Sequence, residues 1–576
     1  MKKLIETQAD FSAMVEDLKN EEIIAADIEA TDIDLQKLVI TGLGLGTSSK
    51  QYYLPFSKGK TDLEVLEGLK TLFLQAVVVF HNAKYDLEVL RKFNLPIPEK
   101  IEDTLIMSWL LDETTPNGLK YLTKNLLDRE VIEFKEVDQR VNLFRDEKDI
   151  LCDMADYCMD DVKNTFDLYD YFLPRLKEQG LDKAYYNIER PFIGVLVDME
   201  MRGVQLDIAW FSKKKEKLAK VLKSYEEKLK KLSGEDLNIH SPQQLEKYLF
   251  NGLGYVPPKV TPIGNKSTDN EALEELVKQY SLTEEDFVPN LLIFRDLDKI
   301  YTTYLVGLLE KAAKDGVIHT SFLQHGTATG RLSSNAPNCQ NIPSRGDEWD
   351  VRRGFIPRKG YRFLVSDYSQ IELRVLAHFS KDKNMVETFM NDGDIHAKTM
   401  ELTGLNRRAA KIVNFGIIYG MGPRTLAQNL GIKEDEAKRY IEKFFAGYPS
   451  VRGFINLIQQ STIERGYVTM ITGRRRRFYN FKDNQWYNLV KRQAFNSRIQ
   501  GSASDIIKIA MIKLNRALKP FDSHLLLQIH DEVVIEVPEG KVKEVKEIVK
   551  ETMETAVKLN VPLKVNTEEG DYWVKG

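Results

Sequence analysis

Apolar residues in the first 180 positions follow two different spacings. Short apolar runs predict β-strands, whereas apolar positions three and four apart predict amphipathic helices. Asp62–Leu74 has helical spacing, and so do most residues from Thr104 to about Lys177. The predicted strands are Glu22–Ile28, Leu38–Gly46, Gln51–Pro55 and Ala76–Phe80. This alternation predicts an α/β unit of about 180 residues.

The pattern changes after this unit. Trp210–Leu232 has apolar residues at helical spacing with many lysines between them, which predicts a solvated helix packed on one apolar stripe. Turn-forming residues gather at Gly252–Asn270 and predict a connection within this helical region. Beyond about Ile318 the pattern is mixed again, and the runs Leu525–Ile529 and Val533–Val537 predict a β-hairpin.

Composition narrows the class of protein. The chain has 576 residues, of which 43% are hydrophobic and 29% charged, as is ordinary for a globular protein of several domains. Its net charge of −4 excludes a uniformly basic nucleic-acid coat but leaves room for local basic grooves. Three cysteines are too few for a disulfide framework or a cysteine zinc cluster. Without a membrane-length apolar run or a signal peptide, the chain is expected to be soluble and intracellular.

The first candidate catalytic residues are acidic and lie in the α/β unit. Asp27 and Glu29 are two residues apart on a predicted strand, so their carboxylates share one face, where they suit Mg²⁺ or Mn²⁺. Asp-x-Glu alone is more often a solvated strand edge. Acidic groups from three elements instead suit a two-metal phosphodiester hydrolase, with a tyrosine orienting the attacking water. The further candidates are Asn82, Asp86, Tyr157 and Asp161.

A second acidic set lies in the C-terminal half. Asp367 follows the apolar run Tyr361–Val365, where a strand gives way to a helix, and Asp531 and Glu532 lie at the tip of the predicted hairpin. Carboxylates at a strand end that face others at a hairpin would form a two-metal clamp for phosphoryl transfer. Taken singly, each is more often a helix cap or a polar turn residue.

Cations and aromatic residues share one predicted helical face. Arg407, Lys411, Phe415 and Tyr419 are each four residues apart. Such a face is either an amphipathic surface with extended basic side chains, or a phosphate grip followed by a base-stacking platform. Both interpretations stay open on spacing alone.

Each of two other motifs has both a structural and a functional interpretation. Gly473–Arg498 carries eight Lys or Arg, including four consecutive arginines, with six aromatic residues among them, which favours a phosphate-tracking groove over a merely solvated charge run. Gly42-Leu-Gly44-Leu-Gly46 resembles a dinucleotide fingerprint, but no helix is predicted after it. These glycines are expected to allow strand twist or close backbone approach near the first acidic pair.

Taken together, these motifs resemble the family A DNA polymerases, in the form of a large fragment that joins a polymerase to a 3′–5′ exonuclease. The resemblance covers essentially the whole chain, and the motifs occur in the order typical of the family. They are Asp27-x-Glu29, Asn82-x3-Asp86, Tyr157-x3-Asp161, Thr329-Gly330-Arg331, Asp367–Arg374, Arg407-x3-Lys411-x3-Phe415-Gly-x2-Tyr419 and His530-Asp531-Glu532.

The resemblance implies an α/β multidomain fold. An RNase H-like 3′–5′ exonuclease domain is expected at residues 1–185, followed by a right-hand polymerase domain at 186–576. The implied thumb covers about 200–318, the palm about 319–378 and 500–576, and the fingers about 379–499. Because only 26 residues precede Asp27, no 5′-nuclease domain is expected, and primer removal is assigned to another protein.

The resemblance also implies a role for each site residue. In the polymerase, Asp367, Asp531 and the Tyr368 carbonyl would bind metal, with Glu532 as an accessory carboxylate. Lys411 would hold the triphosphate and protonate the leaving pyrophosphate. The other implied nucleotide contacts are Arg407, Phe415 on the sugar, Tyr419 at the template-base position, Glu372 as the steric gate, Gln370 and His396. The implied DNA contacts are Arg331, Asn338, Gln340, Arg492, Asn496, Gln500 and His530.

In the implied exonuclease, Asp27, Glu29, Asp86 and Asp161 would bind metal and Tyr157 would assist catalysis. The family commonly has Thr directly after the first Glu, whereas Ala30 stands here, which bears on fine positioning. Two Mg²⁺ per site are implied, with Mn²⁺ as a substitute. The implied partners are primer–template DNA, deoxynucleoside triphosphates and replication accessory proteins, for a monomer in the cytoplasm that is bacterial or phage-encoded.

Two other functions fit parts of the same pattern. A single-subunit RNA polymerase shares helices with such cation spacing, but the bulky Glu372 beside the sugar argues against ribonucleotides. A non-catalytic nucleic-acid binder gains nothing from clustered negative charge that faces phosphates, so the intact carboxylates argue against it.

Overall fold

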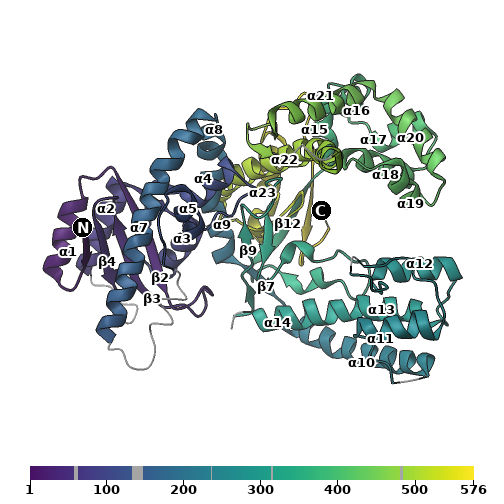
Figure 1. Cartoon of the computed structure of the whole chain (residues 1–576), viewed down its shortest axis with the longest axis horizontal. Helices are drawn as coiled ribbons and strands as arrows, with labels where there is room; N and C mark the ends of the chain where they lie inside the picture. Colours follow the sequence, from purple (N-terminus) through teal and green to yellow (C-terminus); the bar gives the residue numbers. More distant parts are fainter. Residues whose placement is uncertain are drawn as a thin grey trace.

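A computed structural model describes residues 1–56, 63–132, 147–234, 236–261, 263–312, 315–479 and 484–575. Its N-terminal unit, at the purple end of Figure 1, has a six-stranded sheet of order β1-β4-β3-β2-β5-β6. The four predicted strands are confirmed, whereas the short parallel edge strands β1 and β6 were missed. The strands are β1 Lys2–Leu4, β2 Ile23–Ala30, β3 Ile40–Gly46, β4 Gln51–Pro55, β5 Val77–Phe80 and β6 Ile101–Asp103.

Helices cover this sheet. The long helix α7 packs across β2, β3 and β4, close enough that a Cβ atom on Gly44 of β3 would lie 2.6 Å from the Cys158 Sγ. This close approach confirms the expected role of the glycine-rich run, which is a strand and not a dinucleotide loop. The helices of the unit are α1 Gln8–Leu18, α2 Leu63–Gln75, α3 Ala83–Lys92, α4 Thr104–Leu111, α5 Leu119–Leu126 and α7 Glu147–Glu178.

A helical arm follows. Its longest helix, α10, buries Phe211, Leu218, Leu222 and Leu229 along one stripe, as the lysine-rich pattern predicts. The predicted connection lies between a π-helical turn that ends at Gly252 and helix α12. The arm comprises α10 Ile208–Ser233, α11 Pro242–Glu246, α12 Asn270–Tyr280, α13 Phe287–Lys299 and α14 Gly307–Lys311. The elements that precede it in the chain are α8 Asp182–Ala184, α9 Arg190–Arg202, which packs on α3, α22 and β15, and β7 Val204–Leu206.

A four-stranded antiparallel sheet of order β15-β16-β12-β17 forms the centre of the C-terminal unit. The hairpin β15–β16 confirms its prediction. Helices α22 and α23 pack on this sheet. The strands are β12 Tyr361–Tyr368, β15 His524–Ile529, β16 Glu532–Pro538 and β17 Val565–Gly570; the helices are α22 Asn484–Leu518 and α23 Val542–Glu554. Four short strands lie nearby: β8 Val317–Ile318, β9 Ser321–Leu323, β10 Ser333–Asn335 and β11 Phe355–Ile356.

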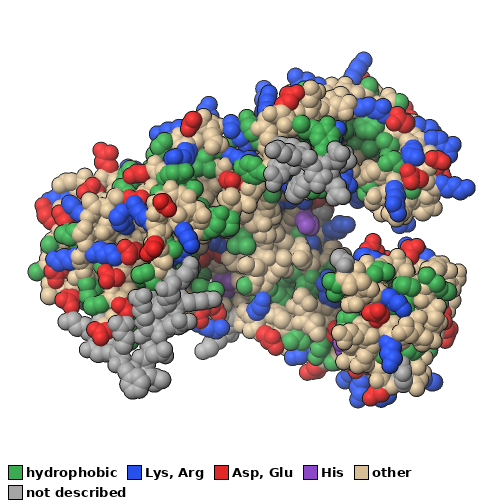
Figure 2. All heavy atoms as spheres, viewed as in Figure 1, with side chains coloured by type: hydrophobic (Ala, Val, Ile, Leu, Met, Phe, Trp, Pro, Cys, Tyr) green, Lys and Arg blue, Asp and Glu red, His purple; other side chains and the backbone are tan. Residues whose placement is uncertain are grey.

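A second helical arm arches over the other side of the central sheet (Figure 1). The space between this arm and α10–α13 is an open hollow in the space-filling view (Figure 2). The arm comprises α15 Ile371–Ser380, α16 Lys383–Met390, α17 Ile395–Thr403, α18 Arg407–Ile418, α19 Pro423–Leu430, α20 Glu434–Gly447, α21 Pro449–Arg465, β13 Tyr467–Thr469 and β14 Arg475–Arg477. Of the helices described, none is both long and apolar enough to cross a membrane.

The N-terminal and C-terminal units have separate apolar cores, drawn from residues 5–197 and 188–573. The arginine run 474–477 helps to join them. Arg474 is 2% exposed and pairs with Asp505 of α22 at 2.9 Å, while Arg477 pairs with Glu113 of the N-terminal unit at 3.1 Å. The predicted phosphate groove is therefore wrong for Arg474 and Arg477, because carboxylates inside the protein neutralise both.

Candidate active sites

The acidic residues of the C-terminal unit meet at one end of the central sheet. Asp367, near the end of β12, lies opposite Glu532, the first residue of β16. The Tyr368 amide donates to the Asp531 carbonyl at 3.2 Å, so antiparallel pairing holds the hairpin turn beside the end of β12. Asp367 is thus brought together with Asp531 and Glu532, which lie more than 160 positions later in the sequence, as the sequence analysis expected.

Charge and burial at this sheet end favour a cation. Burial and the neighbouring Asp531 and Glu532 raise the pKa of Asp367 to about 7. Burial also raises the pKa of Asp531, although Arg331 and His530 oppose that effect. Clustered, half-buried carboxylates of this kind fit a hard divalent cation, which takes oxygen ligands and removes their repulsion. Asp367 and Asp531 are the side chains that would hold it.

Glu532 has two partners that sequence reasoning missed. Its carboxylate accepts hydrogen bonds from Trp573 Nε1 at 2.8 Å and from Arg352 at 3.2 Å, and the Arg352 guanidinium lies over the Trp573 ring. Trp573 is buried and close to the end of the chain, where no motif indicated a role. These contacts hold the Glu532 carboxylate beside Asp367 and Asp531.

Glu372 lies on the first turn of α15, directly after the acidic strand end. Arg331 donates to its carboxylate at 2.5 Å, and the Glu372 residue is 3% exposed. Burial and the hydrogen-bonded Glu372 raise the pKa of the Tyr419 hydroxyl to about 12. The structure thus places three of the predicted site residues, Arg331, Glu372 and Tyr419, in one polar cluster within reach of Asp531.

Helix α18 carries the predicted cations and aromatic residues on one face. The Phe415 and Tyr419 rings stack with centroids 6.3 Å apart, and Tyr419 is 44% exposed. Arg407 pairs with Asp394, whereas the side chain of Lys411 is exposed and has no ion pair among the described residues. His396 is buried, bonded to Asn414 and tilted against Phe415. The face fits a phosphate grip that continues into an aromatic platform.

The other predicted DNA contacts lie on α22 and around the hairpin turn. Arg492, Asn496 and Gln500 are four residues apart on α22, and the Asn496 Oδ1 is a buried acceptor with no partner among the described residues. Gln340 and His530 line a small cavity with Arg331. Asn338 instead caps a short helical turn by accepting from the Gln340 amide at 3.1 Å.

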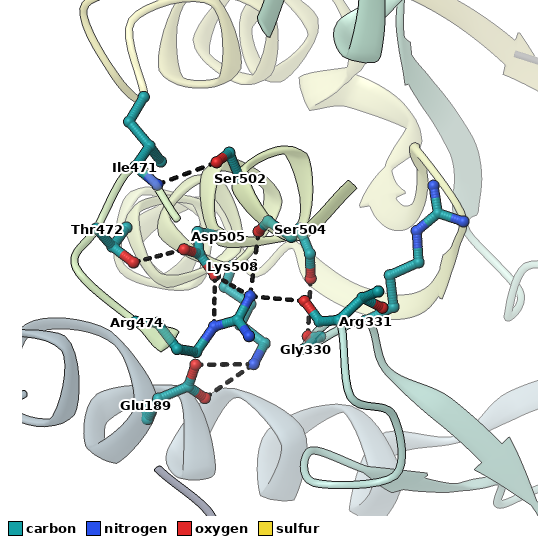
Figure 3. A network of polar contacts seen from close by, with 12 residues as sticks. Glu189, Gly330, Arg331, Ile471, Thr472, Arg474, Ser502, Ser504, Asp505 and Lys508 are labelled. Carbon is teal, nitrogen blue, oxygen red and sulfur yellow. Dashed lines mark hydrogen bonds and ion pairs between the residues drawn. The ribbon is translucent and has the colours of Figure 1, made fainter. Parts of the chain in front are cut away.

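A buried polar network supports Arg331 from behind (Figure 3). The Arg474 guanidinium packs on Gly330, whose φ of +82° and close contact leave no room for a side chain. Ser504 donates to the Gly330 carbonyl at 2.8 Å, and Lys508 pairs with Glu189 at 2.8 Å. The network joins Glu189, the residue directly before α9, to α22 and to the β13–β14 hairpin. It therefore holds the segment that carries Arg331 in place.

The acidic residues of the N-terminal unit form a second, separate site. Glu29, Asp86 and Asp161 are buried, and Asp27 is half-buried. Asp86, on the first turn of α3, accepts a hydrogen bond from the Ile28 amide between the two strand carboxylates at 3.2 Å. Asn82, just before α3, has a left-handed backbone with φ +73°, and both its amide and the Ala83 amide donate to Asp103. All four predicted metal-binding carboxylates are thus brought together.

Repulsion at this second site is strong. Burial, together with Asp161, raises the pKa of Asp27 to about 7, and burial with Asp27 and Asp161 raises the pKa of Glu29 to about 9. Burial also raises the pKa of Asp86. These oxygen donors fit divalent cations, and Asp27, Glu29, Asp86 and Asp161 are the residues that would hold them.

Two further side chains in this site were not predicted. Lys120 of α5 pairs with Asp161 and lies 4.0 Å from the centroid of the Tyr157 ring. The Cys158 Sγ donates to Asp27 Oδ2 at 3.5 Å. Tyr157 hydrogen-bonds to Asp161, as residues one helical turn apart can. Lys120 belongs to none of the acidic motifs, so no sequence signal pointed to it.

The raised pKa values predict a pH-dependent stability without divalent cations. Asp27, Glu29 and Asp367 titrate near 7, 9 and 7 in the folded protein, against 3.8, 4.5 and 3.8 as ordinary values. The folded protein therefore holds more protons than the unfolded chain above about pH 4, and stability falls as the pH rises through 7 towards 9. By calorimetry in EDTA, we expect the unfolding temperature to fall by at least roughly 2 °C between pH 5.5 and 8.5. Added Mg²⁺ should remove most of this fall; an equal fall with Mg²⁺ would contradict the account.

Comparison with known proteins adds independent evidence. A family model described as DNA polymerase family A matches residues 209–575, and a model described as 3′–5′ exonuclease matches residues 3–177. DNA polymerase I of Borreliella burgdorferi is 37% identical over 99% of this chain and 64% of its own length. DNA polymerase I of Pseudomonas aeruginosa is 33% identical over 98% of this chain and 65% of its own length.

A solved structure is similar over its whole length. It is the polymerase domain of Pol1 from M. smegmatis in complex with DNA primer–template and dNTP, with a TM-score of 0.89, 28% sequence identity and 99% coverage of both chains. The chain spans slightly less than two thirds of the length of the two curated relatives.

Proposed function

Because this chain belongs to DNA polymerase family A and carries a 3′–5′ exonuclease domain, we propose that it extends DNA primers and proofreads them. The polymerase site would add deoxynucleotides to a primer 3′ end under the direction of a template. The observation that carries this proposal is the meeting of Asp367 and Asp531 beside the Arg331–Glu372–Tyr419 cluster and the basic face of α18. This arrangement supports a metal clamp, a phosphate grip and a wall beside the sugar within one active site.

The proposed domain assignment follows the architecture. Residues 1–185 are assigned to the exonuclease and 186–576 to the polymerase, with α10–α13 in the thumb, the central sheet in the palm and α16–α21 in the fingers. Primer–template DNA would occupy the hollow between the arms, and a deoxynucleoside triphosphate would lie against α18. The monomeric state, cytoplasmic location and accessory proteins stay predictions.

Several residues of this chain have separate roles in the proposed polymerisation step. Arg407 and Lys411 bind the triphosphate, and Lys411 supplies a proton to the leaving pyrophosphate. Phe415 packs against the sugar, and Tyr419 closes the template-base position until the correct pair forms. Asp367 and Asp531 would hold two Mg²⁺, which would supply stabilisation of the charge on the attacking and leaving oxygens. Arg492, Asn496 and Gln500, one helical turn apart on α22, contact the primer–template.

The proposed proofreading step uses the N-terminal site. Asp27, Glu29, Asp86 and Asp161 hold divalent ions, with Mg²⁺ as the first choice because every carboxylate ligand is a hard oxygen donor. Tyr157, hydrogen-bonded to Asp161, orients the water that attacks the last phosphodiester bond. Ala30 lies next to Glu29 at a point where the β2–β3 register shifts, but all four carboxylates still converge.

A primer-extension assay tests this function directly. With Mg²⁺, a recessed primer and deoxynucleotides, we expect template-length products. Ribonucleotides in place of deoxynucleotides should give little extension, which separates a DNA polymerase from a single-subunit RNA polymerase. Failure to extend the primer with either deoxynucleotides or ribonucleotides would contradict the proposal. Of the functions considered, that result would fit only a non-catalytic nucleic-acid binder.

Sugar selection gives a sharper test. Glu372 is buried and held by Arg331 beside the proposed nucleotide position, so its side chain can reject a 2′-hydroxyl by clash. Glu372→Ala should raise ribonucleotide incorporation relative to deoxynucleotide by roughly tenfold or more, as measured by single-nucleotide kinetics. Glu387→Ala, on the neighbouring helix α16, is the control and should leave the ratio unchanged. An unchanged ratio in Glu372→Ala would show that this carboxylate does not select the sugar.

A further inference from the structure

The proposed exonuclease site contains one cation of its own. The Lys120 ammonium pairs with Asp161 and lies over the Tyr157 ring, with the Lys120 side chain 18% exposed and the Asp161 side chain 7% exposed. Lys120 lies on the first turn of α5, 41 positions before Asp161. Both residues that the acidic motif on α7 contributes, Tyr157 and Asp161, are therefore in contact with this lysine.

The influence of this ammonium reaches the strand carboxylates as well. Its charge favours the ionised forms of Asp27 and Glu29, which burial and mutual repulsion disfavour. Four acidic side chains face one another here, and among the described residues Lys120 is the basic side chain that forms an ion pair with any of them. A single ammonium can neutralise at most one of the four charges, so most of the repulsion remains.

The Lys120 ammonium and a divalent ion would compete for the same carboxylate, that of Asp161. Asp161 is one of the four proposed metal-binding residues, and the Lys120 ammonium is bonded to its Oδ1. A metal ion at Asp161 would place two cations on one carboxylate group. Lysine has a flexible four-carbon stem and a compact charged end, so its ammonium can withdraw without movement of α5.

We propose that Lys120 is a positioning residue of the exonuclease site, an internal countercharge that holds Asp161 in place before metal binds and is exchanged for the metal. This inference rests on the proposed function, because it assumes that the N-terminal carboxylates bind divalent ions. Lys120 would stabilise the metal-free site, in which four acidic side chains from three separate elements lie close together. The consequence is a lower metal affinity than the carboxylates alone would give.

Removal of the lysine charge should therefore tighten metal binding. In Lys120→Met the stem is kept and the competing ammonium is lost. We expect the Mn²⁺ dissociation constant of the exonuclease site to fall by roughly tenfold, the scale of one close charge–charge coupling. Lys120→Arg keeps the charge and should stay near the parent value. Lys124→Met, one turn further along the same helix and exposed, is the matched control and should not change the affinity.

The measurement is isothermal titration of Mn²⁺ into the full-length chain. Asp367→Asn and Asp531→Asn are included in every variant, so that the polymerase site does not contribute heat. Calorimetric unfolding of the same proteins in EDTA and in Mn²⁺ gives a second readout. Lys120→Met should unfold at a lower temperature than the parent in EDTA and gain more from Mn²⁺.

The outcomes separate the inference from the proposed function. Tighter Mn²⁺ binding in Lys120→Met alone, with a larger stabilisation by Mn²⁺, supports the exchange. Equal or weaker binding in a Lys120→Met protein that is folded by calorimetry overturns it, even where the parent binds Mn²⁺ well. Failure of the parent itself to bind Mn²⁺ at this site overturns both the inference and the metal-dependent exonuclease proposal.

Discussion

Asp531→Ala should abolish primer extension and leave 3′–5′ degradation of single-stranded DNA at the parent rate. Asp531 lies in the hairpin turn opposite the end of β12, beside Asp367, and burial raises its pKa in the absence of a cation. Loss of this carboxylate removes a ligand from both proposed metal positions. We expect extension to fall by at least about 10³-fold, because Asp367 alone would be left to hold both ions.

The reciprocal change is Asp27→Ala with Glu29→Ala. These residues lie on β2 in the N-terminal unit, whose apolar core is separate from that of the polymerase unit. Degradation should stop while extension continues near the parent rate, since distant sites without shared partners behave independently. Both activities are measured on both purified variants. Loss of both activities in one folded variant would contradict the two-site account.

Lys411→Ala is the second change with a large expected effect. Lys411 is exposed on the face of α18 that also carries Arg407 and Phe415, and it has no ion pair among the described residues, so its charge is available to a triphosphate. A cation acts most where negative charge develops in the transition state. The single-turnover rate of nucleotide addition should therefore fall by about 10²-fold or more, and nucleotide affinity should fall less.

Arg408→Ala is the control for this prediction. Arg408 is also exposed on α18 but lies about 60° around the helix from Lys411 and about 100° from Arg407, outside the stripe that these two share. Its removal should change the single-turnover rate little. A Lys411→Ala variant with an intact single-turnover rate and a raised KM would show that the lysine binds substrate without assisting the chemical step.

The sequence predicted the candidate site best where local pattern and chemistry coincide. Asp27 and Glu29 share a strand face, Asp367 lies where β12 ends, and Asp531 lies in a hairpin turn, so spacing and turn signals were enough to place them. Helical spacing likewise placed Arg407, Lys411 and Phe415 on one face. In each of these cases the position of the side chain depends on a single helix, strand or turn. A periodic sequence pattern describes a single element of this kind.

The contacts that the sequence did not reveal join elements far apart in the chain. The Lys120–Asp161 pair, the Arg474–Asp505 pair and the Arg477–Glu113 pair each depend on how two elements pack, which no local period records. The sequence of a charge run is therefore the same whether the run binds phosphates or pairs with buried carboxylates. The edge strands β1 and β6 were missed for a related reason, since three residues are too few to establish a spacing of two.

The central claim is that one chain makes and breaks phosphodiester bonds at two separate sites. The most direct measurement uses a primer with a mismatched 3′ end, a template, Mg²⁺ and all four deoxynucleotides, with the products resolved by length and sequence. The parent should first remove the mismatched nucleotide and then give full-length product that carries the correct base. The Asp27→Ala, Glu29→Ala variant should leave the mismatch in place or stall at it, and Asp531→Ala should shorten the primer without extending it. Corrected full-length product from the Asp27→Ala, Glu29→Ala variant, or extension by Asp531→Ala, would contradict the claim.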